Sequence, residues 1–104
     1  MNVKPQVFRR IFDLNGRVAL ITGASTGFGE VIATGFAHYG CDVAVADVNL
    51  DGARRTAQKI TDLGRRSIAI RADVGSPDET RTMVESAMKG LGTIDILVNS
   101  AGTS

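Results

Sequence analysis

The amino-acid sequence predicts an α/β fold in which four parallel strands alternate with three helices. Short apolar stretches rich in β-branched residues recur four times along the 104 residues, and three stretches with helical periodicity separate them. The connections are only a few residues long, which favours right-handed crossovers and a single parallel sheet. With 43% hydrophobic residues, a chain of this length is expected to form one domain and not two.

The first strand, the loop after it and the first helix form the most informative stretch. Residues 18–21, Val-Ala-Leu-Ile, are apolar on both alternating faces, as in a strand buried on both sides. The loop after them contains Gly23, Gly27 and Gly29, and apolar residues then recur at helical spacing. We therefore expect a helix that starts near the last two glycines and ends at Gly40 in a left-handed cap.

Glycine at the start of a helix needs a reason, because it costs up to about 1 kcal/mol relative to alanine inside a helix. A strand, a glycine loop and a helix N-terminus together direct free backbone N–H groups and the positive helix end at one point. This arrangement is typical of phosphate binding. The alternative is a tight connection without a ligand. A P-loop is excluded, because the loop has no lysine.

The second strand and the second helix follow the same pattern. Residues 43–46, Val-Ala-Val-Ala, predict another buried strand, which ends at Asp47. Asn49 is placed to cap a helix, and that helix is expected to stop at Gly64.

The third strand and the third helix carry the strongest helix-start signal of the chain. Residues 67–70, Ser-Ile-Ala-Ile, predict the strand. Ser76 is a suitable N-cap, a proline follows it, and Glu79 is placed for a capping box. We expect this helix to end at Gly90 and Gly92.

Residues 94–98 predict the fourth strand. The predicted fold is a Rossmann-type doubly wound parallel sheet that is incomplete, with four strands and three helices. In such sheets ligands bind beyond the carboxyl ends of the strands, where the strand order reverses. We expect one site at that edge, formed by residues 23–29, Asp47, Asp73 and residues 99–102.

Asp47 makes the interpretation of the glycine loop more specific. It follows Gly23 by 24 residues and ends the second strand. An acidic residue about 20 positions after the loop binds the ribose hydroxyls of a dinucleotide. The alternative is a carboxylate beside a helix, and together with the loop the ribose role is favoured.

Charge and cysteine content exclude several other functions. The net charge of +1 and the scattered basic residues argue against nucleic-acid binding. The single cysteine, Cys41, cannot form an internal disulfide or a multi-cysteine zinc site, so we expect no metal, and a reducing, cytoplasmic location fits. No apolar run approaches the roughly 20 residues that a membrane-spanning helix needs, so no membrane partner is expected.

The first 12 residues differ from the rest of the chain, because basic residues alternate with apolar ones before the first acid, Asp13. We expect an N-terminal extension that packs Phe8 or Phe12 on the domain. The alternative is an organelle-targeting segment.

Three motifs, in order along the chain, resemble those of the short-chain dehydrogenase/reductase family. Residues 22–29, Thr-Gly-Ala-Ser-Thr-Gly-Phe-Gly, look like its Thr-Gly-x-x-x-Gly-x-Gly signature. The Asp73-Val74 pair is similar to its adenine pocket, and residues 99–102, Asn-Ser-Ala-Gly, look like its Asn-Asn-Ala-Gly element. The resemblance covers about residues 12–104 and implies that residues 13–104 are the N-terminal part of an NAD(P)-binding Rossmann domain.

The resemblance also implies a role for each motif residue. The loop residues would contact the ribose and phosphates, and Asp47 would hold the adenosine ribose. The Asp73-Val74 pair would contact the adenine, and residues 99–102 would form the floor near the ribose. The implied cofactor-binding residues are Gly23, Ser25, Gly27, Phe28, Gly29, Asp47, Asp73, Val74, Asn99, Ala101 and Gly102.

Two positions depart from the family pattern, and the charge of Asp47 determines which cofactor we expect. Ser100 replaces an asparagine and Phe28 a smaller aliphatic residue, and both are expected to retune packing without abolishing binding. A branched side chain at Gly27 is expected to fill the phosphate space and to clash where the helix meets the strand. Asp47 stands where a 2′-phosphate would lie, so we expect the chain to prefer NAD over NADP.

The catalytic residues of the family are missing. Its hydride transfer uses a serine and a Tyr-x-x-x-Lys pair, whereas the only tyrosine here, Tyr39, is interpreted as helix packing. We therefore expect no catalytic residue in this chain. The favoured hypothesis is the N-terminal cofactor-binding portion of an NAD(P)-dependent oxidoreductase that acts on a small alcohol or ketone and forms a homo-oligomer when full length. The alternative is a non-catalytic dinucleotide-binding or regulatory module.

The resemblance predicts the strand order third-second-first-fourth. That order leaves the fourth strand at an edge and gives one sheet face a single helix. The chain ends directly after the fourth strand without an element that closes this edge, which favours the fragment hypothesis over the module.

Overall fold

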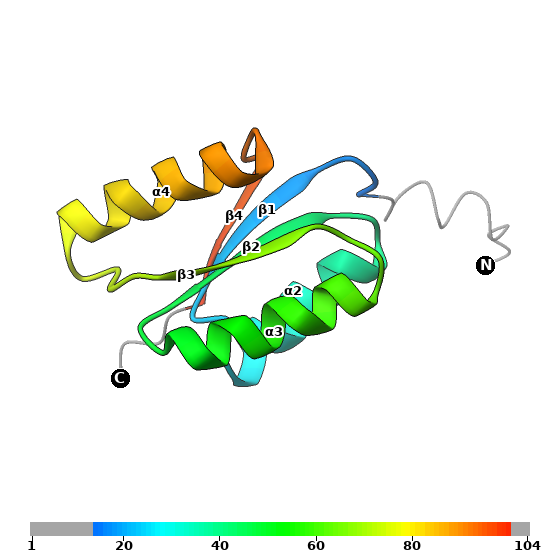
Figure 1. Ribbon diagram of the computed structural model, residues 1–104, viewed down its shortest axis with the longest axis horizontal. Helices are drawn as coiled ribbons and strands as arrows, with labels where there is room; N and C mark the ends of the chain where they lie inside the picture. The colour runs from blue at the N-terminus through cyan, green and yellow to red at the C-terminus, as the bar shows by residue number, and fades with distance from the viewer. Residues whose placement is uncertain (1–13, 101–104) are drawn as a thin grey trace, which may run out of the picture.

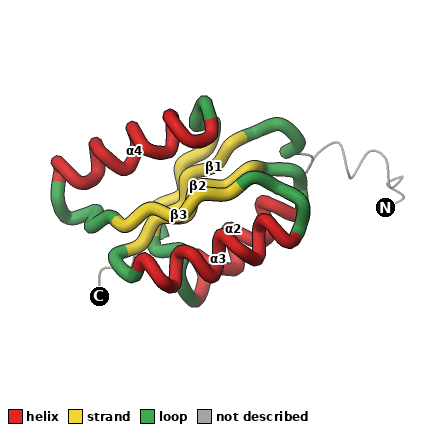
Figure 2. Tube along the Cα trace, in the orientation of Figure 1, coloured by secondary structure: helices red, strands yellow, loops and turns green. Residues whose placement is uncertain are grey.

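The computed structural model describes residues 14–100, so the expectations for the first 12 residues and for Ala101 and Gly102 lie outside it. Strands and helices alternate in the order β1 (Val18–Thr22), α2 (Gly27–His38), β2 (Asp42–Asp47), α3 (Leu50–Asp62), β3 (Ser67–Arg71), α4 (Pro77–Leu91) and β4 (Ile96–Asn99). Figure 2 distinguishes the helices, strands and loops by colour. The strands form one parallel sheet of order β3-β2-β1-β4. The predicted fold class and strand order are confirmed.

The sheet separates two apolar cores, because successive strand residues point to opposite faces. Helices α2 and α3 cover one face, and α4 is the only described helix on the other (Figure 1). Ile21 and Val45 belong to the α2 and α3 side, whereas Leu20 and Ala44 belong to the α4 side. The strands β1 and β2 are therefore buried on both faces, which explains their continuous apolar sequences.

Three of the predicted helix ends are found, and one is only partly right. Asn49 Oδ1 accepts a hydrogen bond from the Gly52 N–H at 3.0 Å, and Gly40 and Gly64 have φ angles of +98° and +88° after α2 and α3. Gly92, with a φ of +90°, ends α4. Gly90 does not end that helix, because it lies within it.

The predicted capping box of α4 is formed by one partner only. Ser76 Oγ accepts from the Glu79 N–H at 3.3 Å, as predicted. The Glu79 carboxylate does not return to the Ser76 N–H, because that N–H donates to the Asp73 carbonyl at 3.0 Å. Glu79 instead accepts hydrogen bonds from Asp73 and Arg71.

The strand β4 begins two residues later than predicted. Asp95 precedes it, and its N–H donates to the Val18 carbonyl at 2.8 Å while its carboxylate accepts from the Val18 N–H at 2.8 Å. A side chain therefore replaces the backbone acceptor that a longer strand would offer to β1. Regular pairing starts at Ile96, opposite Ala19.

The sheet face under α4 is covered unevenly. The helix packs on β3, β2 and β1, and within residues 14–100 it makes no contact with β4. Leu97 of β4 is 61% exposed as a result. The expected edge strand and single-helix face are thus present.

Candidate functional site

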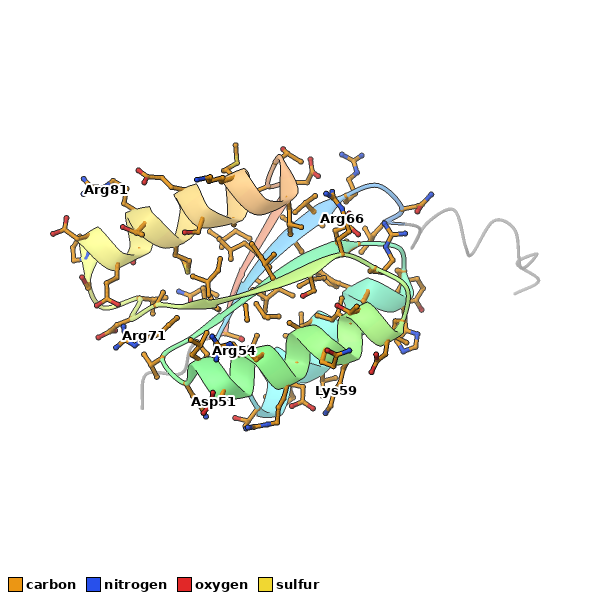
Figure 3. All side chains as sticks on the ribbon, in the orientation of Figure 1. Asp51, Arg54, Lys59, Arg66, Arg71 and Arg81 are labelled. Carbon is orange, nitrogen blue, oxygen red and sulfur yellow. The ribbon has the colours of Figure 1, made fainter. Side chains whose placement is uncertain are left out.

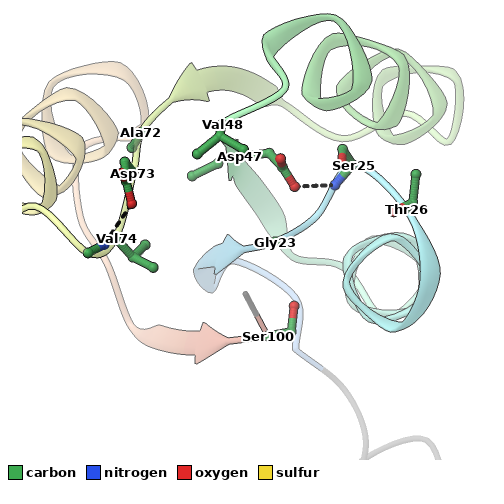
Figure 4. A pocket seen from close by; sticks show the side chains of 11 residues that line it. Gly23, Ser25, Thr26, Asp47, Val48, Ala72, Asp73, Val74 and Ser100 are labelled. Carbon is green, nitrogen blue, oxygen red and sulfur yellow. Dashed lines mark hydrogen bonds between the residues drawn. The ribbon is translucent and has the colours of Figure 1, made fainter. Parts of the chain in front are cut away.

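A pocket of about 480 Å³ opens at the carboxyl edge of the sheet (Figure 4). Its volume falls within the range of roughly 300 to 1,000 Å³ that is usual for small-molecule sites. The ends of all four strands contribute to its lining, which consists of Gly23, Ser25, Thr26, Ala46, Asp47, Val48, Ala72, Asp73, Val74, Gly75 and Ser100. Five of the predicted site residues therefore lie together there: Gly23, Ser25, Asp47, Asp73 and Val74.

The glycine loop turns sharply from β1 into α2. Gly27 adopts a φ of +62°, and a Cβ atom there would meet no atom within 4 Å. A Cβ atom on Gly29 would lie 1.9 Å from the Gly23 carbonyl oxygen, so no residue other than glycine fits at position 29. The predicted clash between helix and strand is therefore wrong for Gly27, and it belongs to Gly29.

The start of α2 leaves its backbone N–H groups available. Its N-cap residue, Thr26, makes no side-chain capping hydrogen bond. The first-turn acid, Glu30, forms an ion pair with Lys59 of α3 at 2.6 Å, so its charge is compensated away from the loop. Uncapped N–H groups at a helix N-terminus favour an anion such as a phosphate.

The helix α3 supports this loop from behind. The buried Thr56 hydroxyl donates to the Ala24 carbonyl at 2.7 Å. A Cβ atom on Gly52 would lie 2.5 Å from the Ser25 Cβ, so the helix approaches the loop closely. Sequence reasoning missed both residues; a polar threonine on the apolar face of α3 was the available signal.

Asp47 lies at the end of β2 and holds the two loops on either side of it. Its Oδ2 accepts from the Ser25 N–H at 3.2 Å, drawn in Figure 4, and its Oδ1 accepts from the Asn49 N–H at 2.9 Å. Partial burial acts to raise the pKa of Asp47, but hydrogen bonds from Asn49, Ser25 and Val48 outweigh it and lower the pKa below its ordinary value. The group is an ionised carboxylate whose oxygens keep lone pairs for further donors.

Asp73 stands across the pocket from Asp47, in the turn between β3 and α4. Its Oδ1 accepts from the Gly75 N–H at 2.9 Å, and Val74 beside it is half-buried. The side chain itself is exposed toward the pocket (Figure 4).

The other predicted residues lie around the pocket but not in its lining. The Asn99 Oδ1 accepts from the Thr22 hydroxyl at 2.7 Å, which joins the ends of β4 and β1. Its neighbour Ser100 lines the pocket, and its hydroxyl donates to the Thr22 carbonyl. Phe28 is 86% exposed at the start of α2 and does not contribute to the core. Gly27 and Gly29 lie at the start of α2, next to the lining.

No three or more His, Cys, Asp or Glu side chains come close enough together within residues 14–100 to hold a metal ion. None of the helices in this part of the chain is long and apolar enough to span a bilayer.

Comparison with known proteins gives one consistent result. The family model for short chain dehydrogenases matches residues 17–104. The 2-dehydro-3-deoxy-D-gluconate 5-dehydrogenase of Dickeya dadantii is 43% identical over 91 residues, which are 88% of this chain and 35% of that protein. The 7alpha-hydroxysteroid dehydrogenase of Escherichia coli is 43% identical over 89 residues, or 86% of this chain and 35% of that protein.

Solved structures agree with the sequence comparisons. A crystal structure of hydroxysteroid dehydrogenase from Escherichia coli superposes with a TM-score of 0.85 at 41% identity, covering 88% of this chain and 39% of that one. A 7 alpha-hydroxysteroid dehydrogenase complexed with NADH and 7-oxo glycochenodeoxycholic acid gives a TM-score of 0.83 at 41% identity, covering 85% of this chain and 34% of that one. The chain spans about a third of the length of these relatives. It belongs to the short-chain dehydrogenase family, whose enzymes are NAD(P)-dependent oxidoreductases.

Proposed function

We propose that residues 13–104 bind a nicotinamide adenine dinucleotide and form the N-terminal cofactor-binding portion of an oxidoreductase that acts on a small alcohol or ketone. One observation carries this proposal: the uncapped start of α2 and the ionised Asp47 carboxylate border the same pocket. Donors for a diphosphate and an acceptor for ribose hydroxyls are thus combined.

The residues of the pocket fit such a cofactor. The loop from Gly23 to the first turn of α2 offers backbone N–H groups to the diphosphate, and Gly29 allows the helix to start this close to the strand. Asp47 has free lone pairs for the ribose hydroxyls. On the opposite wall, Asp73 and Val74 offer an acceptor and an apolar contact to an adenine ring. Asn99, Ala101 and Gly102 are proposed to lie below the ribose.

The described site binds and orients; it does not transfer protons. The bound nicotinamide would supply the hydride chemistry. Tyr39 is the only tyrosine in the sequence, and Lys4, Lys59 and Lys89 are the only lysines, so no Tyr-x-x-x-Lys pair is present. We therefore assign carbonyl protonation to residues of a longer protein. The similarity to dehydrogenases about three times longer, and the uncovered β4, support this assignment.

The experiment that tests the proposal measures binding and turnover together. We expect the 104-residue chain to bind NADH, detected by calorimetry, and to leave NADH unoxidised in the presence of a panel of small ketones. Absence of binding by a folded chain would contradict the cofactor role. Turnover above the buffer rate would contradict the assignment of catalysis to other residues.

The alternative, a non-catalytic dinucleotide-binding module, predicts the same binding. The reading frame beyond Ser104 separates the two. A serine and a Tyr-x-x-x-Lys pair encoded there would establish the enzyme, whereas a stop codon together with accumulation of the short protein in cells would favour the module.

A further inference from the structure

We infer that Glu79 is a positioning residue for adenine recognition, acting through the turn of residues 73–75 and not by contact with the cofactor. This inference rests on the proposed function, because it concerns how one wall of the proposed cofactor pocket is held. Glu79 is absent from the pocket lining, whereas all three residues of the turn are present in it.

Glu79 joins three elements through one oxygen atom. From the first turn of α4, its Oε1 accepts from the Asp73 N–H at 3.2 Å and from Arg71 Nη1 at 2.8 Å. Arg71 is the last residue of β3, and Asp73 begins the turn. The end of a strand, the turn and the helix start are therefore fixed relative to one another by a single carboxylate.

This contact differs from the usual role of a glutamate at the third position of a helix. Such a residue commonly reaches back to the N-cap N–H. Here the N–H of the N-cap, Ser76, is already bound to the Asp73 carbonyl, so Glu79 is left to hold the Asp73 N–H. Both backbone groups of Asp73 are thus engaged by the start of α4. Thr80 adds a weak hydrogen bond from its hydroxyl to the Val74 carbonyl at 3.4 Å.

A fixed backbone matters because the Asp73 side chain is exposed and short. Its Oδ1 is occupied by the Gly75 N–H, and its Oδ2 has no hydrogen-bond partner among residues 14–100. With the backbone held on both sides, this second oxygen keeps one direction at the pocket wall, where an adenine amine could donate to it. Without Glu79 the turn would lose one anchor, and ordering it on binding would cost conformational entropy.

Arg71 reduces the electrostatic repulsion between the carboxylates of Glu79 and Asp73. Glu79 and Asp73 bring two carboxylates to one turn, and neighbouring like charges disfavour each other. The ion pair between Arg71 and Glu79, at 2.8 Å, compensates the charge of Glu79 and leaves that of Asp73 for the ligand. Figure 3 places Arg71 at the end of β3, beside the turn into α4.

The test compares two dinucleotides in matched variants. Nicotinamide hypoxanthine dinucleotide lacks the exocyclic amine of NAD⁺ and retains the ribose and phosphate groups, so the ratio of the two dissociation constants reports on Asp73. We expect the wild-type chain to favour NAD⁺. Glu79→Ala should weaken NAD⁺ binding about fivefold and the hypoxanthine analogue less than about twofold, because one charge-assisted hydrogen bond to the turn is lost.

Two controls separate positioning from helix stability. Asp78→Ala removes a carboxylate from the same helical turn, where the Asp78 side chain pairs with Arg81 at 3.5 Å and not with the turn, and should leave the ratio unchanged. Glu79→Gln keeps an acceptor oxygen and should restore most of the NAD⁺ preference. If Glu79→Ala does not fold, as judged by circular dichroism, Arg71→Gln provides the comparison, because Glu79 then loses the partner that orients it.

The outcomes distinguish this inference from the function on which it rests. A folded wild-type chain that binds neither dinucleotide contradicts the proposed function. A wild-type chain that binds both equally, or a ratio that Glu79→Ala and Arg71→Gln leave unchanged, contradicts the inference alone. A ratio that falls in those variants and returns in Glu79→Gln supports it.

Discussion

At the scale of single residues, the site depends on two glycines that are required for different reasons. Gly29 has no room for a side chain, because the Gly23 carbonyl lies where its Cβ would be. Gly27 has the room, but its φ of +62° is a backbone conformation that other residues adopt at a cost. The first supports the fold and the second the shape of the loop.

Substitution by alanine should separate these two roles. Gly29→Ala is expected to abolish folding, since backbone atoms cannot move out of the way. Gly27→Ala should fold with a loss of about 1 to 2 kcal/mol, the usual cost of the left-handed conformation, and should weaken NAD⁺ binding further by crowding the phosphates. Urea denaturation and calorimetric titration measure the two effects. Equal stability of the two variants would contradict the geometry described for Gly29.

The charge of Asp47 is expected to select NAD over NADP. A 2′-phosphate close to this carboxylate would meet a repulsion on the order of 4 kcal/mol at about 4 Å and an effective dielectric constant near 20, before solvent reduces it. No lysine or arginine is among the described residues that line the pocket, and Arg54, on the neighbouring helix, pairs with Asp51 at 3.7 Å (Figure 3).

Titration of the chain with both dinucleotides checks this prediction. We expect at least about tenfold tighter binding of NAD⁺, because roughly 1.4 kcal/mol of the repulsion should remain. Asp47→Asn should narrow the difference by removing the charge while keeping an acceptor oxygen. Equal affinities of the wild-type chain for both would exclude this role of Asp47.

At the scale of elements, the carboxylate of Asp42 joins strands at the amino-terminal end of the sheet, opposite the pocket. Asp42 begins β2, accepts from the Arg66 N–H at 2.9 Å and from its Nε at 3.0 Å, and lies 3.1 Å from Arg65 Nη2. Arg66 also donates to the Leu91 carbonyl at the end of α4. The Asp42 carboxylate thus joins β2 to the start of β3, and Arg66 extends the connection to the last turn of α4.

This cluster should make stability depend on pH in the acid range. Burial acts to raise the pKa of Asp42, but hydrogen bonds from Arg66 and the charges of Arg65 and Arg66 outweigh it, so the pKa lies below the ordinary value of 3.8. The stabilisation is therefore complete above the unfolded-state pKa and is lost as pH falls through the lower folded-state value.

Urea denaturation at a series of acidic pH values measures this effect. Asp42→Asn should be less stable than the wild type near neutral pH and should lose less stability on acidification. Asp62→Asn is a suitable control, because Asp62 makes only an exposed contact with Gln58 on the same helix. Parallel acid profiles of the wild type and Asp42→Asn would contradict the prediction.

The elements and most of the caps could be predicted because their signals are local. A run such as Val-Ala-Val-Ala or a serine before proline acts within a few residues, and the strand order followed from the family resemblance. The start of β4 and the partner of Glu79 could not be predicted, because Asp95 bonds to Val18 and Glu79 to Arg71 across contacts that only the fold creates. The support of the loop by Thr56 was missed for the same reason.

At the scale of the whole molecule, α4 covers only part of its sheet face within residues 14–100. Leu97 is 61% exposed on β4, and Val84 and Met88 of α4 are 37% and 44% exposed. Each such side chain forgoes part of the roughly 1.5 to 3 kcal/mol that full burial would contribute, against a usual total stability of about 5 to 15 kcal/mol. An exposed edge strand adjoins them, and such edges pair readily with other chains.

The 104-residue chain is therefore expected to associate in solution. Its mass by light scattering should exceed that of a monomer of 11.0 kDa and rise with concentration. Leu97→Lys should lower the apparent mass, since a lysine on an edge strand opposes pairing. Arg55→Lys, on an exposed position of α3, is the matched surface control. A compact monomer of the wild-type chain at all concentrations would contradict this expectation.

The strand order β3-β2-β1-β4 also determines when each strand can pair with its neighbours during synthesis. β1 emerges first from the ribosome and can pair with β2 after one short helix, but its other edge waits for β4, 77 residues further along the chain. At about 5 to 20 residues per second, this delay is roughly 4 to 15 s. During that interval β1, a central strand of the finished sheet, is an edge strand, so a nascent chain exposes this apolar segment to chaperones and to other chains being synthesised on the same messenger RNA.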